Sequence, residues 1–549
     1  MNPISNLTLY NCKLDRTMHK TIDFSNQSAR DSYFSSNNAI ATIVSTPFNG
    51  DAYFIRENNT IKVGINADIL DFNGVNYCRF NNPQSGTNSY FYAFIDNIEY
   101  SAPYTSILHI RTDVMLTNMR NFTTNECFVE RSHIAKSDDD FYNQITPESV
   151  DYGDICIYSD TRVTTNLSAR TLTEFGTNYY ICLNMSEPLN GAPFTHINYI
   201  GAVPNLSYFY CFDWTDLNYI NDQINQHGQS EAVISIFAVP KIYVSIKSTI
   251  NYNGHDLYVV DEKDYSDFQT FLIVNYPTMA NGYNPRNKKL LCYPYNYLRL
   301  HNHNNSSIDL KWENSTNPTG EIDIKTVMAM GTNANVIAIP VNYENFGSDY
   351  YSEYLGNYEN AVDCNGFPEI PWITDTYKTY IALNKNSIET QKINMTYNSS
   401  TKLIKNIANQ NPTGIVTSLT EDFLTQQEFE NQMTDMQKQP DKIHGTIPGN
   451  VGFKCGSLGI FVSRMSCKTA YAEKIDKYFD MYGYNISAVQ TPNWTNRAHY
   501  NYVKTSGIDI YGAISKNDKE EIANIFNSGV TFWHISGGGV YGTYDVNNN

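Results

Sequence analysis

The sequence contains no motif that marks a catalytic centre. It has no Gly-x-Ser-x-Gly and no Gly-rich loop followed by Lys-Ser or Lys-Thr, the patterns of a nucleophile elbow and a phosphate cradle. Residues 536–539 (SGGG) lack the lysine of such a cradle, so we interpret them as a flexible segment. A facing pair of carboxylates for glycan cleavage leaves no sequence signature, and that alternative stays open. We therefore expect a protein that is not an enzyme and has no cofactor.

The ten cysteines lack the spacing of a metal site or of a disulfide framework. They are scattered singly and form no Cys-x-x-Cys, so we expect most of them to be small buried hydrophobes of a protein assembled in a reducing cytosol. His301 and His303 lie two apart at a predicted hairpin tip and could face the same way as metal ligands. No third ligand is marked, so solvated turn histidines are the favoured interpretation. Residues 138–140 lack the glycine and closing glutamate of a calcium loop, and we predict no metal site.

Long hydrophobic runs are also missing. The longest, residues 232–240, is far short of the roughly 20 residues that a spanning helix needs. The first sixteen residues show no cationic segment followed by an apolar core, so we do not expect a signal peptide. Any membrane contact would have to come from a loop or from assembly.

Basic residues are few. The 38 lysines and arginines stand against 56 acidic residues, and the formal net charge is −18. A protein that binds free nucleic acid needs basic patches, and the nearest cluster, residues 286–289, reads as a short exposed turn. The acidic balance favours solubility, and in a tube it would let DNA slide past the wall without sticking.

Tyrosine and asparagine are what the chain has in quantity. The 43 tyrosines outnumber lysine and arginine together, and Tyr and Thr favour strands while Asn, Ser and Gly favour turns. At 549 residues we expect several domains, in an α+β fold that is mostly β. No period of 20–50 residues repeats clearly, which disfavours a solenoid.

Turn residues and periodicity divide the chain into five expected segments. They are an N-terminal antiparallel β domain with a hairpin formed by residues 90–100 and 106–114, a mixed β domain with one helix at residues 215–227, a second β domain ending in a helix, an inserted helix–loop–helix arm and a C-terminal α/β domain. The expected boundaries are 1–135, 136–288, 289–397, 398–456 and 457–549.

The arm is predicted from two helical patterns around a turn. Residues 372–397 look helical at both ends of an Asn-Lys-Asn-Ser break at 384–387, and residues 401–408 form a further short helical piece. The turn Asn-Pro-Thr-Gly follows at 411–414, and a second helix is predicted over 421–438 with Ser418 as its cap. Between the turn and that helix lies an apolar tip of Ile415, Val416 and Leu419.

The C-terminal domain has the clearest pattern. One helix is predicted from the stripe Ile475, Tyr478, Phe479 and Tyr482. A second is predicted from Asn517, with Glu520 three residues on, to Gly529. Strand-like runs at 458–462, 486–489, 499–504 with 508–511, and 530–535 complete the order β-α-β-β-α-β. We therefore predict a ferredoxin-like unit with a four-stranded sheet.

Four stretches together resemble one protein family. Residues 90–134 begin YFYAFIDNIEY, residues 289–300 read KLLCYPYNYLRL, residues 377–392 read YKTYIALNKNSIETQK, and residues 478–534 run from YFDMYGY through NWTNRAHYNYVKT to SGVTFWH. They resemble the tail knob (distal tail tube) protein of small short-tailed bacteriophages, podoviruses of the picovirus type. The resemblance implies a structural protein of the virion tail in which the domains 1–135 and 289–397 are tail-tube-like.

The resemblance also implies partners. It predicts a homohexamer whose lumen conducts genomic double-stranded DNA without sequence-specific binding, with a lower collar (connector) tail protein above and a cell-wall hydrolase at the tip. Six copies of a chain of charge −18 would carry −108, which fits a non-stick conduit.

In one segment the chain departs from the family. Some members carry a long apolar loop between the third and fourth stretches that plugs the tube and then opens the membrane, whereas residues 398–452 here are shorter and mostly polar. The resemblance places a channel plug that contacts the host cytoplasmic membrane at the tip of the arm, at Pro412, Gly414, Ile415, Val416, Leu419 and Phe423.

Two alternatives remain beside the conduit. A receptor-binding or glycan-degrading tail protein predicts a cleft with two facing carboxylates or an aromatic platform. A membrane-active pore former predicts leakage of liposomes that disappears when residues 411–420 are deleted.

Overall fold

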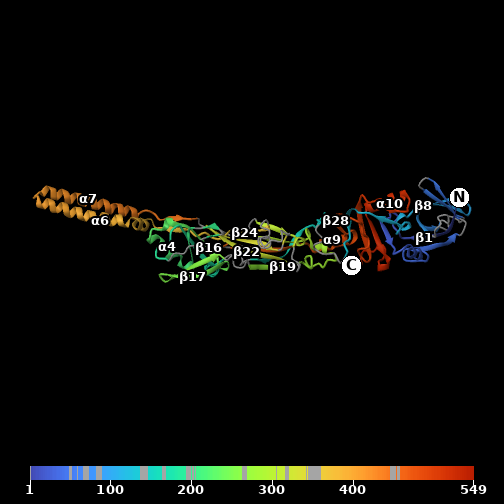
Figure 1. The fold of residues 1–549 in the computed structure, drawn as a ribbon, viewed down its shortest axis with the longest axis horizontal. Coiled ribbons are helices and arrows are strands. Elements are labelled where there is room, and N and C mark those ends of the chain that lie inside the picture. Colours follow the sequence, from blue (N-terminus) through green and yellow to red (C-terminus); the bar gives the residue numbers. More distant parts are fainter. Residues whose placement is uncertain are drawn as a thin grey trace.

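The computed structural model describes most of the chain. The described residues are 2–48, 52–57, 60–65, 73–81, 90–135, 146–163, 169–192, 199–200, 203–204, 206–262, 269–303, 306–315, 321–341, 343, 360–445, 453, 455 and 458–548. The molecule is long and narrow, with the N-terminal strands and the C-terminal helices at one end, three sheets in the middle and a helical hairpin at the other end (Figure 1). Mostly β structure with a few helices agrees with the predicted class.

The N-terminal sheet closes on itself. Its order is β3-β1-β4-β5-β8-β7-β6, and β6 also pairs with β1. The buried side chains of this sheet include Leu108 and Ile110, which lie in the second strand of the predicted hairpin. The strands are β1 (Asn2–Cys12), β3 (Ala41–Phe48), β4 (Ala52–Glu57), β5 (Thr60–Ile65), β6 (Tyr77–Asn81), β7 (Tyr90–Ala102) and β8 (Thr105–Thr112).

The second sheet joins the two ends of the chain. Its order is β2-β31-β29-β10-β28, and β2 runs parallel to β31. The strands are β2 (Lys20–Asp23), β10 (Cys127–Ser132), β28 (Tyr484–Gln490), β29 (Tyr500–Ser506) and β31 (Val530–His534). Nearby lie the short helices α1 (Gln27–Tyr33) and α2 (Val114–Thr117) and the small ladder of β9 (Phe122–Thr124) with β30 (Ile510–Gly512). One hydrophobic cluster runs from the N-terminal strands into α10, so these regions share a core.

Both C-terminal helices form where the apolar stripes predict them. Helix α9 (Thr469–Tyr482) buries Ile475 and Phe479, and helix α10 (Lys516–Ser528) buries its own apolar face. Gly483 and Gly529 follow them at φ values of 62° and 97°, where a Cβ would be strained. The predicted cap at Asn517 is wrong. Helix α10 begins two residues earlier on Ser515, whose hydroxyl accepts a hydrogen bond from the Asp518 N–H.

The predicted ferredoxin-like unit is wrong, because its first strand belongs to another sheet. Strand β27 (Phe461–Cys467) pairs with β11 (Ile155–Arg162) on one side and β20 (Asn296–His301) on the other. Within the second sheet, β10 separates β28 from β29. Strands from the first 135 residues therefore take places that a self-contained unit would fill with its own strands.

Three antiparallel sheets form the middle of the molecule. They have the orders β11-β27-β20-β21, β16-β12-β15-β18-β17 and β19-β22-β23-β24. Helix α4 (Leu217–Gln226) buries Ile220 and Ile224, as its stripe predicts. The remaining elements are α3 (Leu172–Asn178), β12 (Tyr179–Met185), β13 (Tyr199–Ile200), β14 (Val203–Pro204), β15 (Tyr208–Phe212), β16 (Val233–Pro240), β17 (Val244–Tyr252), β18 (His255–Glu262), β19 (Gln269–Asn275), β21 (Ser307–Leu310), β22 (Glu321–Met330), β23 (Ala334–Val341) and β24 (Val362–Cys364).

One cysteine pair departs from the expectation of free thiols. Cys182 on β12 and Cys211 on β15 lie directly opposite each other in the ladder and form a disulfide. They are 29 residues apart, so only the strand register brings them together. Of the eight free cysteines, six are buried, which confirms the prediction for most of them.

The segment 286–289 is only in part the exposed turn that we predicted, because Arg286 and Lys288 are exposed but the two other residues are not. Asn287 and Lys289 are buried, and the Asn287 amide donates to both Asp476 and Asp480 of helix α9 at 2.9 Å. Arg286 pairs with Asp480 at 3.1 Å. Arg286 and Asn287 therefore satisfy buried carboxylates, and Lys289 donates to the Thr146 carbonyl, so Arg286 and Lys289 are engaged within the fold.

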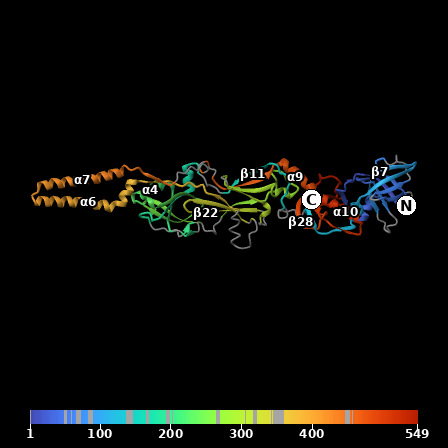
Figure 2. The same cartoon turned by 90° about the horizontal axis from the view of Figure 1, so that it is seen from above.

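The helical hairpin consists of α6 (Thr376–Ala408) and α7 (Pro412–Gln437), which lie side by side in both views (Figures 1 and 2). At about 1.5 Å per residue, the 33 residues of α6 span about 50 Å. The predicted break at 384–387 is wrong, because α6 continues through it. Asn and Ser cost only about 0.5 kcal/mol each in a helix, and the packing of buried Ile388 offsets that cost. None of the helices in the described part of the chain is long and apolar enough to span a bilayer.

Candidate functional site at the tip of the helical hairpin

The root of the hairpin is fixed to the body by a two-stranded ladder. Strand β25 (Trp372–Thr374) pairs with β26 (Lys442–His444), so Thr374 lies opposite Lys442. Asp375 caps α6 by accepting the Lys378 N–H at 2.9 Å. Burial of Asp375 opposes ionisation, but the hydrogen bonds and charge of Lys378 outweigh it and lower the pKa of this carboxyl. Asn225 of α4 accepts the Asp375 N–H at 3.0 Å and holds the root against the neighbouring sheet.

The turn between the helices is shorter than predicted. Helix α7 begins at Pro412, with the Asn411 side chain accepting the Gly414 N–H at 3.0 Å, so residues 412–414 belong to the helix. Proline suits this position because its missing N–H would have no intrahelical partner there. The prediction that Ser418 caps a helix starting at 421 is therefore wrong. The predicted short helix 401–408 is the end of α6.

Ser418 instead joins the two helices inside the hairpin. It is buried, and the Asn406 amide of α6 donates to its hydroxyl at 3.2 Å and to the Gly414 carbonyl at 2.9 Å. A Cβ on Gly414 would lie 2.8 Å from the side-chain amide nitrogen of Asn411, so glycine leaves room for the Asn411 cap. Lys402 and Glu421 add an ion pair across the hairpin at 3.3 Å.

Four of the six predicted site residues point into solvent. Pro412, Val416, Leu419 and Phe423 are exposed, while Gly414 and Ile415 are half-buried. The exposed fractions are 64% for Val416, 51% for Leu419 and 64% for Phe423. Their spacing of i, i+3 and i+7 places these three on one stripe of α7. The structure thus places three of the six predicted residues on one exposed stripe of α7.

Sequence reasoning missed a second set of exposed apolar residues on the same hairpin. They are Leu383, Ile393, Tyr397, Ile404, Ile407 and Leu424, each at least half exposed. Four of those on α6 recur at i, i+4, i+11 and i+14, which is a helical stripe. The spacing was visible in the sequence, but the assumed break at 384–387 hid a single long helix.

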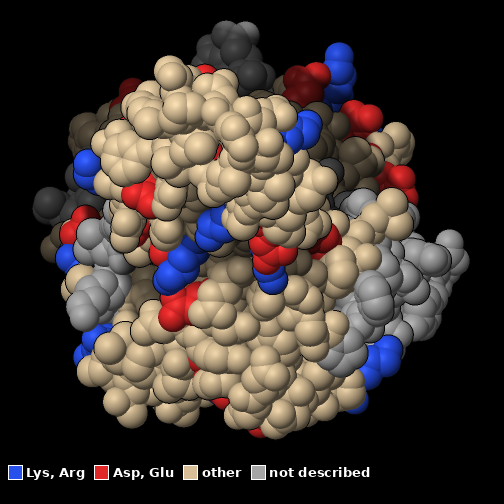
Figure 3. Space-filling view, turned by 90° about the vertical axis from the view of Figure 1, so that its left-hand side faces the viewer, with Lys and Arg blue, Asp and Glu red and all other residues tan. Residues whose placement is uncertain are grey.

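The two helices carry opposite charge. Helix α6 has five lysines and one glutamate, a formal charge of +4, and α7 has five acidic residues and no lysine or arginine, a formal charge of −5. Figure 3 looks onto this end of the molecule and shows both signs interspersed with a larger uncharged surface. The surface of the hairpin therefore combines charged, polar and apolar side chains, and helix α6 is positive while helix α7 is negative.

A pocket of about 390 Å³ lies at the other end of the molecule, between the N-terminal residues and the second sheet. Phe122, Trp494 and Phe532 contribute aromatic walls. Asp23 is the single carboxylate among the described residues that line it, and it is paired with Arg120 at 2.8 Å. Two facing carboxylates, which glycan cleavage would need, are not present in this lining.

The prediction of two solvated histidines is correct for only one of them. His303 is 44% exposed, but His301 is the last residue of β20 and its side chain is 11% exposed. Both imidazoles approach Asp160 of β11, a ligand that the sequence did not mark. The acidic loop 138–140 lies outside the described residues.

Comparisons with known proteins agree with this architecture. The family described as the C-terminal domain of tail knob protein gp9 of Bacillus phage phi29 matches residues 253–549, and the family of caudoviral major tail protein N-termini matches residues 5–123. Tail knob protein gp9 of Bacillus phage PZA is 24% identical over 96% of this chain and 95% of its own length. Tail knob protein gp9 of Bacillus phage phi29 is 24% identical over 90% of both.

A solved structure shares the fold. The tail knob protein gp12 of bacteriophage C1 matches with a TM-score of 0.61 and covers 96% of both chains. The sequence identity is 17%, so this match shows the fold alone.

Proposed function

Because the chain belongs to the phi29 gp9 family of tail knob proteins and is a component of the phage virion tail, we propose that it assembles as a homohexameric tube. This tube would form the distal end of the tail and conduct double-stranded DNA into the bacterial host. The related proteins are named as tail knob proteins, structural parts of a tail, which is consistent with a non-enzymatic protein. The hexamer, the conduit and the roles of the hairpin are the parts that we propose.

The observation that carries the proposal is the exposed apolar surface of the hairpin. The single chain leaves in water Val416, Leu419 and Phe423 on α7 and the second set, which lies on α6 apart from Leu424. A two-helix hairpin that projects from the body has no core of its own to cover them. Large exposed apolar patches on soluble proteins mark interaction sites. Further copies of the same hairpin, gathered around a common axis, would cover both stripes.

The charges of the two helices support a ring. A helix of charge +4 beside a helix of charge −5 is self-complementary when each α6 faces the α7 of the next chain. Such a contact joins two different surfaces, and contacts of that kind close into rings when the rotation allows it. Six hairpins arranged in this way would fill or line the lumen, and we propose that they plug the channel before DNA release.

We further propose that the tip contacts the host cytoplasmic membrane after release. Val416, Leu419 and Phe423 together would contribute a few kcal/mol per chain, at about 0.8 kcal/mol per buried methylene. That is too little for one chain to insert, but six tips acting together would bind. The two ends of the elongated molecule differ (Figure 2). We propose that one end contacts the lower collar protein and the opposite end contacts the cell-wall hydrolase at the far end of the tail.

Removing the hairpin tests the plug. Since Thr374 and Lys442 lie opposite each other in the β25–β26 ladder, residues 376–440 can be replaced by a short Gly/Ser linker without parting the strands that flank the cut. End-on electron micrographs of the full chain should show rings with density in the lumen. Because the deletion also removes the hairpin contacts between subunits, it is imaged at a higher protein concentration, where it should show rings with an open centre. A matched control replaces only residues 411–420 and should keep most of the lumen density. Lumen density that persists without the hairpin would contradict the plug.

A further inference from the structure

Three strands of one sheet bring a potential ligand set together. In the sheet β11-β27-β20-β21, Asp160 of β11 lies opposite Ser463 of β27. On the other side of β27, Ser463 lies opposite Arg299 of β20, and His301 follows two residues later. Because side chains two apart share a face of a sheet, Asp160, Ser463 and His301 all lie on one face. His303 follows β20 at a φ of 58° and lies beside them.

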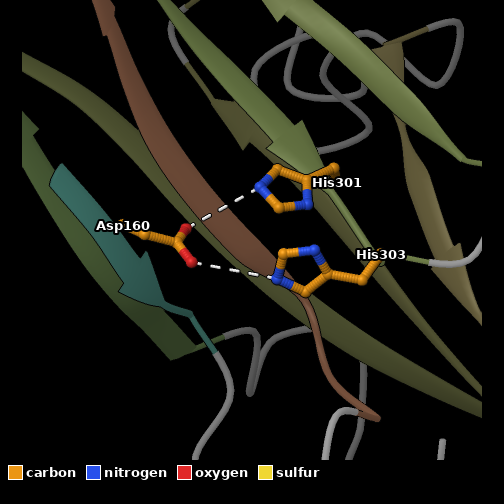
Figure 4. Close-up of side chains that lie close together, drawn as sticks. All are labelled: Asp160, His301 and His303. Carbon is orange, nitrogen blue, oxygen red and sulfur yellow. Dashed lines mark ion pairs between the residues drawn. The ribbon is translucent and has the colours of Figure 1, made fainter. Parts of the chain in front are cut away.

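The three ligand atoms converge (Figure 4). The Nε2 atom of His301 lies 3.7 Å from Oδ1 of Asp160, and Nε2 of His303 lies 3.8 Å from Oδ2 of the same carboxylate. The ligand atoms of all three residues lie within 4.8 Å of one another. Bonds of about 2.1 Å to a tetrahedral ion place neighbouring ligands about 3.4 Å apart. The two histidine–aspartate distances exceed this value by a few tenths of an ångström and no ligand separation exceeds 4.8 Å, so a small movement of the imidazoles would seat an ion between the three side chains.

Neighbouring residues hold the ligands in place. The ring of Phe461 stacks against His301 and lies 4.3 Å from the ring of His303, centroid to centroid. The Ser463 hydroxyl donates to Asp160 Oδ1 at 2.8 Å. The amide of Asn302, the residue between the histidines, donates to the Asp363 carbonyl at 2.8 Å and fixes the turn. Ligands held by packing and by a second layer of hydrogen bonds lose little freedom when an ion binds.

The cluster does not have the geometry of a hydrolase triad. Asp160 accepts its hydrogen bond from Ser463, whereas the acid of a triad accepts from the histidine. The nearby guanidinium of Arg299 is held by Asp309 at 2.7 Å and 3.0 Å, so its charge is compensated there. The carboxylate of Asp160 is thus left facing two imidazoles.

We propose that Asp160, His301 and His303 form a binding site for one divalent transition-metal ion of the zinc class. Two imidazole nitrogens and one carboxylate oxygen suit zinc and its first-row neighbours better than magnesium or calcium, which prefer oxygen alone. On binding, His301 Nε2 exchanges its 2.7 Å hydrogen bond to Ser463 for the ion, with the ring proton on Nδ1. Asp160 and His303 are partly exposed, so water completes the coordination. The ion would tie β11 to the end of β20 across β27, which is a structural role.

Metal titration of the full chain tests this site. Binding of Zn2+ is measured by calorimetry and by displacement of Co2+, whose visible absorption reports nitrogen and oxygen ligands. The variants are His303→Ala, whose side chain is on the surface, and Asp160→Asn, which keeps an acceptor for Ser463. The matched control is His109→Ala, which removes a histidine that contacts Glu99 at 2.8 Å and belongs to no group of three potential ligands among the described residues. Thermal unfolding with and without Zn2+ gives a second readout.

We expect one Zn2+ per chain in the wild type and in His109→Ala, with a higher Tm when the ion is present. Binding should weaken at least about tenfold in His303→Ala and in Asp160→Asn, and the Tm shift should be lost in both. No saturable binding to the wild type would overturn the proposal. Binding that falls by less than tenfold in the two variants, or that falls equally in His109→Ala, would also overturn it.

Discussion

The apolar stripe of α7 gives the sharpest test of how the chain assembles. We consider the triple variant Val416→Gln, Leu419→Gln and Phe423→Gln. Gln has nearly the helix propensity of Leu, and the three side chains are 64%, 51% and 64% exposed in the single chain. The variant should therefore change the free energy of unfolding of the monomer by less than about 1 kcal/mol.

Its effect on assembly should be far larger. Full burial of one such side chain is worth about 1.5–3 kcal/mol, and half to two-thirds of each is still exposed. Covering the stripe against neighbouring hairpins would then contribute about 3–5 kcal/mol per chain. At about 1.4 kcal/mol per factor of ten, the variant should weaken each contact between subunits by about two to nearly four orders of magnitude.

Light scattering coupled to size exclusion measures this effect. The matched control substitutes the exposed threonines Thr417, Thr420 and Thr425 of the same helix with Gln, which leaves the apolar stripe intact. The wild type and the threonine triple should elute as the assembly at micromolar concentration, and the stripe variant as a smaller species with an unchanged unfolding midpoint. Equal assembly of both triples would refute the reasoning, because the stripe would then face solvent in the assembled protein.

Three further measurements probe the body of the chain. Burial raises the pKa of Asp113 from its ordinary 3.8 to about 6, so the folded chain binds that proton more tightly, and the free energy of unfolding should fall by about 2 kcal/mol as pH rises from 4 to 6. Asp113→Asn should remove this fall in urea titrations across that range, and equal slopes for both proteins would contradict it. Asn287→Ala should lower the free energy of unfolding by about 2–4 kcal/mol, because it leaves Asp476 and Asp480 short of donors. The control Asn386→Ala, at an exposed position, should lower it by less than about 1 kcal/mol. An equal loss of stability in the two variants would contradict the proposed hydrogen-bond network. Alkylation of the denatured chain without reductant should label eight of the ten cysteines, and ten labelled cysteines would rule out the Cys182–Cys211 bond.

Local patterns in the sequence predicted the elements that depend on local physics. Helices α4, α9 and α10 and the β7–β8 hairpin form where apolar spacing and turn residues place them. The helix ends were less predictable. Asn411 and Ser515 cap α7 and α10, whereas the sequence pattern predicts Ser418 and Asn517 as the caps.

The pairing of strands that are far apart in the chain could not be predicted from the sequence. Strand β27 has the same apolar pattern whether it pairs within the C-terminal domain or with β11 and β20. Nothing local shows that β10 enters between β28 and β29. The same limit hid the Cys182–Cys211 pair and the approach of Asp160 to His301 and His303, because each depends on the register of strands far apart in the chain.

The resemblance read from four stretches of sequence is confirmed at the level of family. The site residues at the hairpin tip stay a prediction. The structure shows that Val416, Leu419 and Phe423 share a stripe, and their role in plugging or membrane contact follows only if the hairpins gather in the lumen.

The central claim is a six-membered tube, and the mass of the purified full chain in solution, paired with end-on electron micrographs, tests it most directly. With 62.6 kDa per chain, a mass six times larger and a six-membered ring whose lumen is filled by the hairpins are the predicted result. A monomer, or an assembly that is not a ring, under conditions in which the hairpin is folded would contradict the account.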